Sequence, residues 1–230
     1  MDIPDNVIRQ KLRSVYFIWG RGKTTIADEL RRKYKCFVYR TDESRRLHLA
    51  DADPSYQPHM CRDYEKEYGV SSFWELPHEV IREREKHWLH EFTPMAIVDL
   101  ILLAGAHDVI LCEGDIEYET VIPVASHMVH LSNRGTKFDW FNRPGHSHAL
   151  DDVKNRADLS QEEKDAIISN AYSAVGQNEA PLPDWVVRHA ITDIAWDDNT
   201  TIEQTASEVA QYFGWAARRR RKRQRDRSLV

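Results

Sequence analysis

An apolar run that stops at a short glycine turn and continues as a helix is the feature that most constrains this chain. Residues 15–30 read VYFIWGRGKTTIADEL. The run Val15–Trp19 is apolar and aromatic and is bounded by Gly20, which is typical of a buried strand. After Lys23, apolar residues recur at helical spacing: Ile26, Ala27, Leu30 and Tyr34. The segment therefore predicts strand, turn and helix in immediate succession.

The same alternation continues along the chain. We expect further strands at 36–39, 109–112, 127–131 and within 187–196, and helices at 23–35, from 41, 72–91, 94–104, 160–174 and 201–213. Two stretches, 51–70 and 132–150, are expected to be loops. Strands that alternate with helices predict a three-layer α/β fold with a mainly parallel, five-stranded sheet flanked by helices.

The turn carries the residues of a phosphate-binding loop. Backbone amides at the start of a helix form an anion site, and a lysine adds a point charge to the outer phosphates. Lys23 matches that lysine, and Thr24 matches the hydroxyl residue that binds Mg²⁺. We therefore predict that Gly20, Arg21, Gly22, Lys23, Thr24 and Thr25 bind the phosphates of a nucleoside triphosphate.

The loop is nevertheless shorter than the usual G-x-x-x-x-G-K-[ST] spacing, because only Arg21 separates Gly20 from Gly22. About three residues are missing, and about three phosphate-binding amides with them. Each charge-assisted hydrogen bond contributes on the order of 1.5–3 kcal/mol, so the loss lowers the expected affinity by orders of magnitude. The Arg21 guanidinium, which binds phosphate bidentately, is expected to offset part of this loss.

Two further carboxylates are predicted where strands end. Ligands of parallel α/β sheets collect at the carboxyl ends of the strands. Asp42 follows the second strand and is a candidate catalytic residue that receives the acceptor's hydroxyl proton; its alternative role is a helix N-cap. Glu113 ends the third strand and is a candidate ligand of Mg²⁺ through water; its alternative is a turn carboxylate without a ligand.

Arginines in the loop at 132–150 complete the candidate set. Phosphoryl transfer requires cations around the moving group, and a closing loop often supplies them. Arg134 and Arg143 are the candidate catalytic residues of this kind. Solvated loop arginines are the alternative interpretation.

Composition and charge limit the class of protein and its expected location. A hydrophobic content of 41% favours a packed core over disorder. Three cysteines, no signal-peptide core and no apolar stretch of membrane-spanning length predict a soluble cytoplasmic protein. The segment RRRRKRQRDR (218–227) holds eight Lys and Arg residues, so the rest has 24 basic against 36 acidic residues. This basic segment has two open interpretations, which are a disordered solvated tail and a weak contact with nucleic acid.

Several stretches in order resemble bacterial P-loop kinases related to small-molecule and nucleoside kinases. These are YFIWGRGKTTIADEL (16–30), VYRTDE (38–43), ADPSYQPHM (52–60), SFWELPHEVIREREKHWLHEF (72–92), PMAIVDL (94–100) and VILCEGD (109–115). The resemblance covers about residues 14–215, which leaves an N-terminal extension at 1–13 and a basic tail at 216–230. It implies an adenylate-kinase-like P-loop NTPase core, ATP with Mg²⁺, and phosphoryl transfer to a small hydroxyl-bearing acceptor.

Two functions remain open at this point. The first is an ATP-dependent small-molecule kinase, which the resemblance and the residues at three strand ends favour. The second is a kinase-derived binding or regulatory protein without turnover, which the shortened loop favours.

Overall fold

The computed structural model describes residues 3–134, 150–174 and 183–215. These residues fall into two compact units. The sheet unit combines 3–48, 92–134 and 183–215, and the helical unit combines 49–91 and 150–174. The predicted arginine Arg143 and the basic tail at 216–230 lie outside the described residues.

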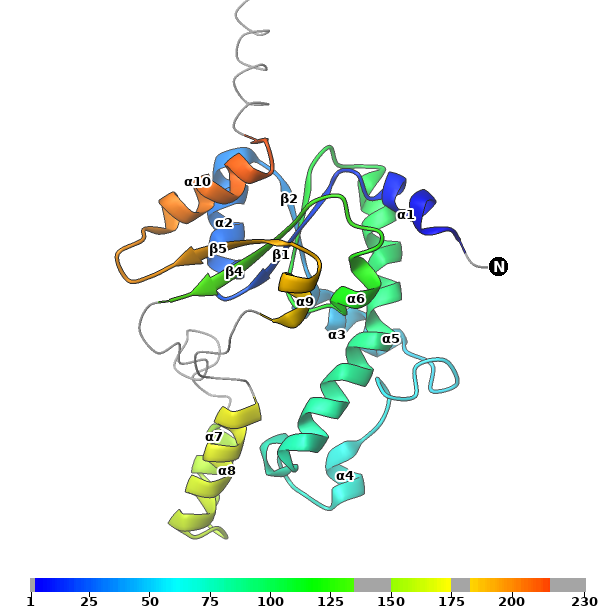
Figure 1. The fold of residues 1–230 in the computed structure, drawn as a ribbon. Coiled ribbons are helices and arrows are strands. Elements are labelled where there is room, and N and C mark those ends of the chain that lie inside the picture. Colours follow the sequence, from blue (N-terminus) through cyan, green and yellow to red (C-terminus); the bar gives the residue numbers. More distant parts are fainter. Residues whose placement is uncertain (1–2, 135–149, 175–182, 216–230) are drawn as a thin grey trace, which may run out of the picture. The chain divides into compact units, whose positions relative to one another are not determined.

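The sheet unit is built on five parallel strands in the order β2-β3-β1-β4-β5 (Figure 1). The strands are β1 (Val15–Gly20), β2 (Phe37–Arg40), β3 (Ile110–Glu113), β4 (Met128–Asn133) and β5 (Thr192–Trp196). Every paired neighbour runs parallel. The predicted α/β fold with a five-stranded parallel sheet is thus confirmed, and the carboxyl ends of all five strands share one edge.

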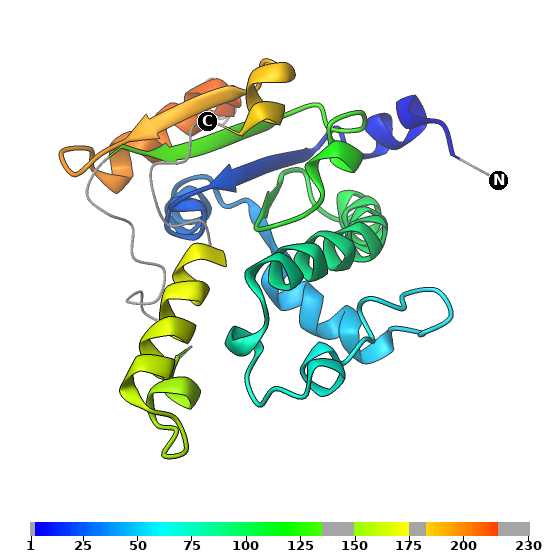
Figure 2. The same ribbon diagram turned by 60° about the horizontal axis from the view of Figure 1, so that its bottom comes forward.

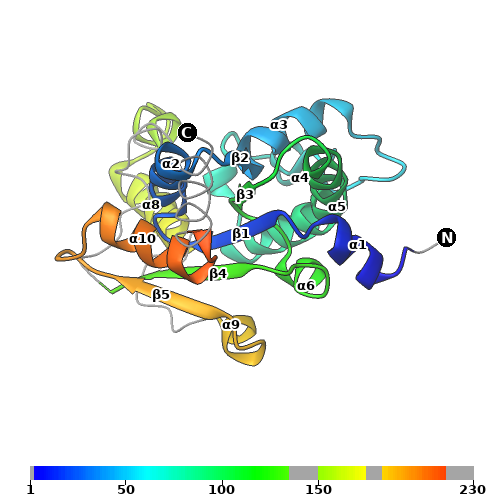
Figure 3. The same cartoon turned by 90° about the horizontal axis from the view of Figure 1, so that it is seen from above.

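Helices α2 (Lys23–Tyr34) and α10 (Ile202–Tyr212) cover one face of the sheet and lie side by side (Figures 1 and 3). Alternation along β1 directs Tyr16 and Ile18 to this face. They pack in a fully buried cluster with the apolar stripes of both helices, which include Ile26, Ala27, Leu30, Ala206 and Val209. This cluster fixes α2, and with it the turn that precedes α2, against the sheet.

The opposite face is covered by residues 92–104 of α5 (His78–Ala104), with α6 (Tyr118–Val121) and α9 (Asp184–Arg188) (Figure 2). The odd residues of β1 point here, and Trp19 meets Trp185 of α9 edge to face at 5.4 Å. Tyr39 Oη of β2 donates a 2.8 Å hydrogen bond to Asp99 Oδ2 of α5. Helices on both faces complete the three layers.

Short helices extend both units. In the sheet unit, α1 (Asp5–Lys11) precedes β1, and α3 (Thr41–Asp51), which belongs to this unit up to His48, leaves β2 without an intervening loop. The helical unit contains α4 (Tyr64–Tyr68), the 3₁₀ turn η1 (Phe73–Glu75), α7 (Asp151–Lys154), α8 (Gln161–Ala174) and the first part of α5. Its core packs Tyr64, Leu76 and Ile81 together. None of the described helices is long and apolar enough to span a membrane.

Several elements differ from the sequence-based expectation. The two helices expected at 72–91 and 94–104 form the single helix α5, which runs through Pro94. A proline inside a helix costs about 3 kcal/mol, and burial of Phe92, Ala96 and Leu100 beside it offsets that cost. Ser72 caps only η1, through its side chain and Trp74 N. The segment 187–196 contains the end of α9 before β5 begins.

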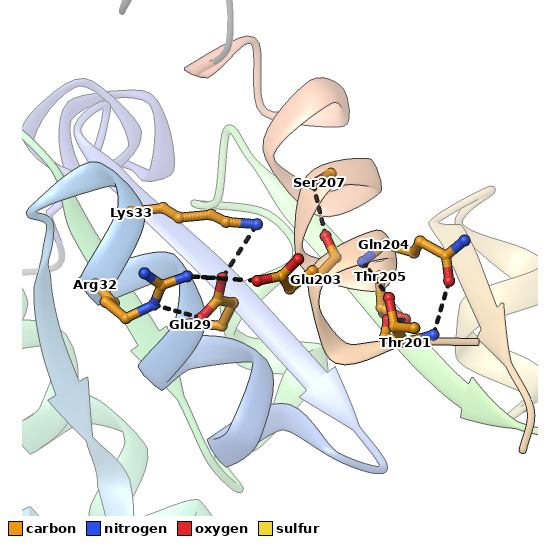
Figure 4. A network of polar contacts seen from close by, with 8 residues as sticks. All are labelled: Glu29, Arg32, Lys33, Thr201, Glu203, Gln204, Thr205 and Ser207. Atoms are coloured by element: carbon orange, nitrogen blue, oxygen red, sulfur yellow. Dashed lines mark hydrogen bonds and ion pairs between the residues drawn. The ribbon is translucent and has the colours of Figure 1, made fainter. Parts of the chain in front are cut away.

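Polar side chains join α2 to the start of α10 on the solvent side (Figure 4). Glu29 accepts from Arg32 at 2.7 Å and lies 3.1 Å from Lys33, and Arg32 reaches Glu203 of α10 at 3.7 Å. Thr201 and Gln204 form a reciprocal capping box at the first turn of α10. Arg32 and Glu203 are exposed, whereas Glu29 and Lys33 are half-buried, so the pair that links the two helices is open to solvent and contributes little stability.

Candidate functional site

The turn between β1 and α2 is held against β4 by its first glycine. Gly20 has φ +92°, and a Cβ placed on it would lie 2.0 Å from the carbonyl oxygen of Leu131. The next amide, Arg21 N–H, donates to that same oxygen at 2.9 Å. Only glycine fits this conformation and this distance. The path of the chain into the turn is therefore set by contact with the neighbouring strand.

Trp196, the last residue of β5, braces the other side of the turn. Its indole Nε1 donates to the carbonyl oxygen of Arg21 at 3.0 Å. Gly22 has φ +81° and packs on the indole, where an added Cβ would lie 3.0 Å from Trp196 Cζ2. The indole thus fixes both the carbonyl of Arg21 and the left-handed residue that precedes α2.

The start of α2 presents a row of available amides. Gly22 is the N-cap residue, and the first amide to bond back to it is Ile26 N–H, at 3.0 Å. Among the described residues, no protein acceptor meets the amides of Gly22, Lys23, Thr24 or Thr25. These amides form the positive end of a twelve-residue helix, which is the arrangement that binds anions such as phosphate.

The ammonium group of Lys23 lies beside this row and faces a carboxylate. Lys23 Nζ is 3.2 Å from Asp115 Oδ1, and the lysine side chain is only 20% exposed. Burial lowers the pKa of Lys23, but Asp115, Asp42 and Glu113 together outweigh it and raise the pKa above its ordinary value. Lys23 is therefore a permanent cation at the edge of the sheet.

Thr24 and Glu113 are brought together from the first turn of α2 and the end of β3. Thr24 Oγ1 donates to Glu113 Oε2 at 3.2 Å, and the Glu113 residue is only 5% exposed. Burial raises the pKa of Glu113, whereas Lys23, Arg40 and the Thr24 hydrogen bond act in the opposite direction. The two predicted Mg²⁺-binding residues are thus direct neighbours.

Arg40 forms an ion pair with Glu113. Arg40 Nη1 donates to Glu113 Oε1 at 2.8 Å, and Arg40 Nη2 donates to Asp28 Oδ1 of α2 at 2.6 Å. The strand register places Arg40 directly beside Glu113 on adjacent strands. Both oxygens of the Glu113 carboxylate are consequently engaged, one by a hydroxyl and one by a guanidinium.

The remaining predicted site residues, Asp42, Thr25 and Arg134, lie in different surroundings. Asp42 lies in the first turn of α3, which begins at Thr41, so the expected N-cap role of Asp42 is wrong. Its charge acts on both Lys23 and Glu113, and it therefore belongs to the same edge. Thr25 is exposed on α2, and Arg134 is exposed directly after β4, where its amide donates to the carbonyl of Trp196 at 2.8 Å.

Sequence reasoning missed the partners that hold these groups. Asp28 lies one helical turn after Thr24, so it faces the same side of α2, and this spacing is a signal that the sequence does contain. Asp115 follows Glu113 by two residues. Trp196 is 175 residues from Arg21, and no local pattern indicates their contact.

Comparisons with known proteins add little. No family model and no curated protein match the sequence. Among solved structures, the chain is similar to an unliganded sugar kinase from Janibacter sp. HTCC2649, with 13% identity over 87% of this chain and 94% of that chain. The TM-score is 0.35, and no conclusion about fold or function is drawn from a similarity at that level. Assignment to P-loop kinases is accordingly a proposal.

Proposed function

We propose that this protein is an ATP-dependent phosphotransferase that moves the γ-phosphoryl group to a hydroxyl of a small acceptor. The observation that carries the proposal is the convergence of open amides, a lysine and a buried carboxylate at one edge of a parallel sheet. The amides of Gly22 to Thr25, the Lys23 ammonium and the Thr24–Glu113 pair all lie where β1 and β3 end. Polyphosphates are bound by such an arrangement.

The residues present fit a Mg²⁺ ion. Mg²⁺ prefers hard oxygen ligands and uses one or two protein groups together with phosphates and waters. The Thr24 hydroxyl and the Glu113 carboxylate offer two such oxygens 3.2 Å apart. The described residues contain no cluster of three or more His, Cys, Asp or Glu side chains able to hold a metal alone. A bound Mg²⁺ would neutralise charge on the phosphates.

In the proposed reaction, the bond between the γ-phosphorus and its bridging oxygen breaks, and a bond to the acceptor oxygen forms. Asp42 receives the proton of the acceptor hydroxyl. Lys23 exchanges Asp115 for the outer phosphates, because Asp115 is 56% exposed and can be solvated instead. Arg21, Arg134 and Arg143 are proposed as further cations around the transferred group.

The short loop is expected to weaken the binding of ATP. The usual loop has four residues between its glycines, whereas this chain has only Arg21, and the Arg21 amide is already bonded to Leu131. Affinity for ATP is therefore expected to be lower than a full loop would give. The acceptor and the preference for ATP over GTP are not specified by these contacts.

The test is calorimetric titration of ATP with Mg²⁺ into the wild type and two lysine variants. Lys23→Met removes a charge-assisted contact to phosphate, worth on the order of 1.5–3 kcal/mol, and should weaken binding ten- to hundredfold. Lys33→Met is the matched control, because Lys33 lies in the last turn of the same helix, where its ammonium group is 3.1 Å from Glu29. The proposal is wrong if folded wild-type protein binds no ATP at millimolar concentration.

A further inference from the structure

Four polar side chains form a ring that begins and ends on α2. Thr24 Oγ1 donates to Glu113, Glu113 accepts from Arg40 at 2.8 Å, and Arg40 donates to Asp28 at 2.6 Å. Thr24 and Asp28 are one helical turn apart, which closes the ring through the helix backbone. We name these four residues the polar ring.

The polar ring controls which Glu113 oxygen is available. Arg40 bonds Oε1, whereas Thr24 bonds Oε2. The carboxylate is therefore held in one orientation, with Oε2 turned toward the hydroxyl that the proposed Mg²⁺ site uses. The Glu113 side chain is only 6% exposed, so these two contacts, rather than solvent, set the orientation of its carboxylate.

Asp28 in turn fixes Arg40. An arginine side chain has many rotamers, and a second anchor restricts them. Arg40 is 18% exposed, whereas the Asp28 side chain is 59% exposed. Asp28 consequently holds the guanidinium from the solvent side, and Glu113 holds it from the buried side.

We propose that Arg40, fixed by Asp28, is the positioning residue that orients Glu113 toward Thr24 for Mg²⁺–nucleotide binding. The proposal rests on the proposed function and deepens it, because it assigns a role to two residues that touch neither phosphate nor metal. Partners that orient a metal-binding carboxylate typically change metal affinity 10–100-fold when they are removed.

A merely structural role would have a different signature. If the polar ring only fastens α2 to the sheet, its loss misplaces the amides of α2 and weakens ATP binding equally with and without metal. If Arg40 orients Glu113, only the gain in affinity that Mg²⁺ provides should fall. The measurement is therefore the Mg²⁺-dependent gain in affinity, which is the ATP dissociation constant in EDTA divided by that in Mg²⁺, determined for each variant.

The experiment compares wild type with Arg40→Gln, Arg40→Lys and Asp28→Asn, with Arg32→Gln as the matched control on the solvent side of α2. Arg40→Gln should reduce the Mg²⁺-dependent gain about tenfold and leave binding in EDTA unchanged. Arg40→Lys restores the charge without the two-point geometry and should recover part of the gain. Asp28→Asn should reduce it a few-fold and keeps the test valid if Arg40→Gln fails to fold.

The outcomes separate the two proposals. An Arg40→Gln variant whose Mg²⁺-dependent gain equals that of the wild type overturns the positioning role but leaves the proposed function standing. Equal losses in Mg²⁺ and in EDTA assign the polar ring to structure alone and also overturn it. A wild type that binds ATP in neither condition overturns the proposed function and this inference together.

Discussion

Replacing Gly20 with alanine tests whether close approach to β4 shapes the turn that starts α2. The change adds one methyl group at a residue with φ +92°, 2.0 Å from the carbonyl oxygen of Leu131. The added carbon would therefore lie well inside normal contact with that oxygen. The same oxygen accepts from the Arg21 amide at 2.9 Å, so the substitution affects the adjacent hydrogen bond as well.

The expected loss in free energy of unfolding has two parts. Alanine at positive φ costs about 1–2 kcal/mol. The shortest ordinary distance between a carbon and an oxygen atom is about 3.3 Å, so the turn must move away from Leu131 by roughly 1 Å. That shift breaks the hydrogen bond from the amide of half-buried Arg21 to Leu131, at a cost of about 1–3 kcal/mol. The expected loss in free energy of unfolding is about 2–5 kcal/mol.

Gly214→Ala is the matched control. Gly214 has φ +71° in the same unit, but a Cβ there would meet nothing within 4 Å. Only the conformational cost of about 1–2 kcal/mol should appear. Urea unfolding followed by tryptophan fluorescence measures both variants. Equal losses in free energy of unfolding for the two substitutions would show that the close contact between Gly20 and Leu131 contributes nothing to stability, and the account of the turn would then be incorrect.

Three further predictions concern the turn, a carboxylate and the thiols. Inserting three residues between Gly20 and Gly22 restores the usual loop spacing and should raise ATP affinity at least tenfold by calorimetry; an unchanged affinity would contradict the role assigned to the missing amides. Lys23 holds the pKa of Asp115 below its ordinary value, so Asp115 stabilises the fold at neutral pH, and this contribution is lost as the pH falls through the folded pKa. Asp115→Asn should therefore cost up to about 1 kcal/mol at pH 7, because Asp115 is 56% exposed, and progressively less as the pH is lowered; a cost that does not change with pH would refute this. Burial raises the pKa of Cys36 to about 11, and Cys112 is also buried, so Ellman's reagent at pH 8 should modify only exposed Cys61 in native protein; rapid reaction of all three would contradict the described core.

Elements with a clear period and a clear boundary were predictable from the sequence. β1 and α2 follow from a continuous apolar run, a glycine stop and helical spacing over one short segment. The capping box of α10 was also within reach, since Thr201 and Gln204 have the required spacing. The parallel sheet follows because strands joined by helices must cross over.

Elements decided by tertiary packing were not predictable. Pro94 indicates a helix boundary locally, yet burial of the residues around it keeps α5 continuous. Aspartate is a preferred N-cap residue, but α3 begins directly at the end of β2 and places Asp42 inside its first turn. In the site, Lys23, Thr24 and Glu113 were identifiable by motif, whereas Arg40 acquires its role only through its register with Glu113.

The contact between Trp196 and the turn has a consequence for the order of assembly. The indole that fixes Arg21 and Gly22 belongs to the last strand of the sheet, far along the chain from the glycines it supports. During synthesis, the strand, turn and helix at 15–34 leave the ribosome long before Trp196 does. The nascent segment 15–34 therefore lacks this brace until Trp196 has been synthesised, and the turn can take the conformation described here only after that.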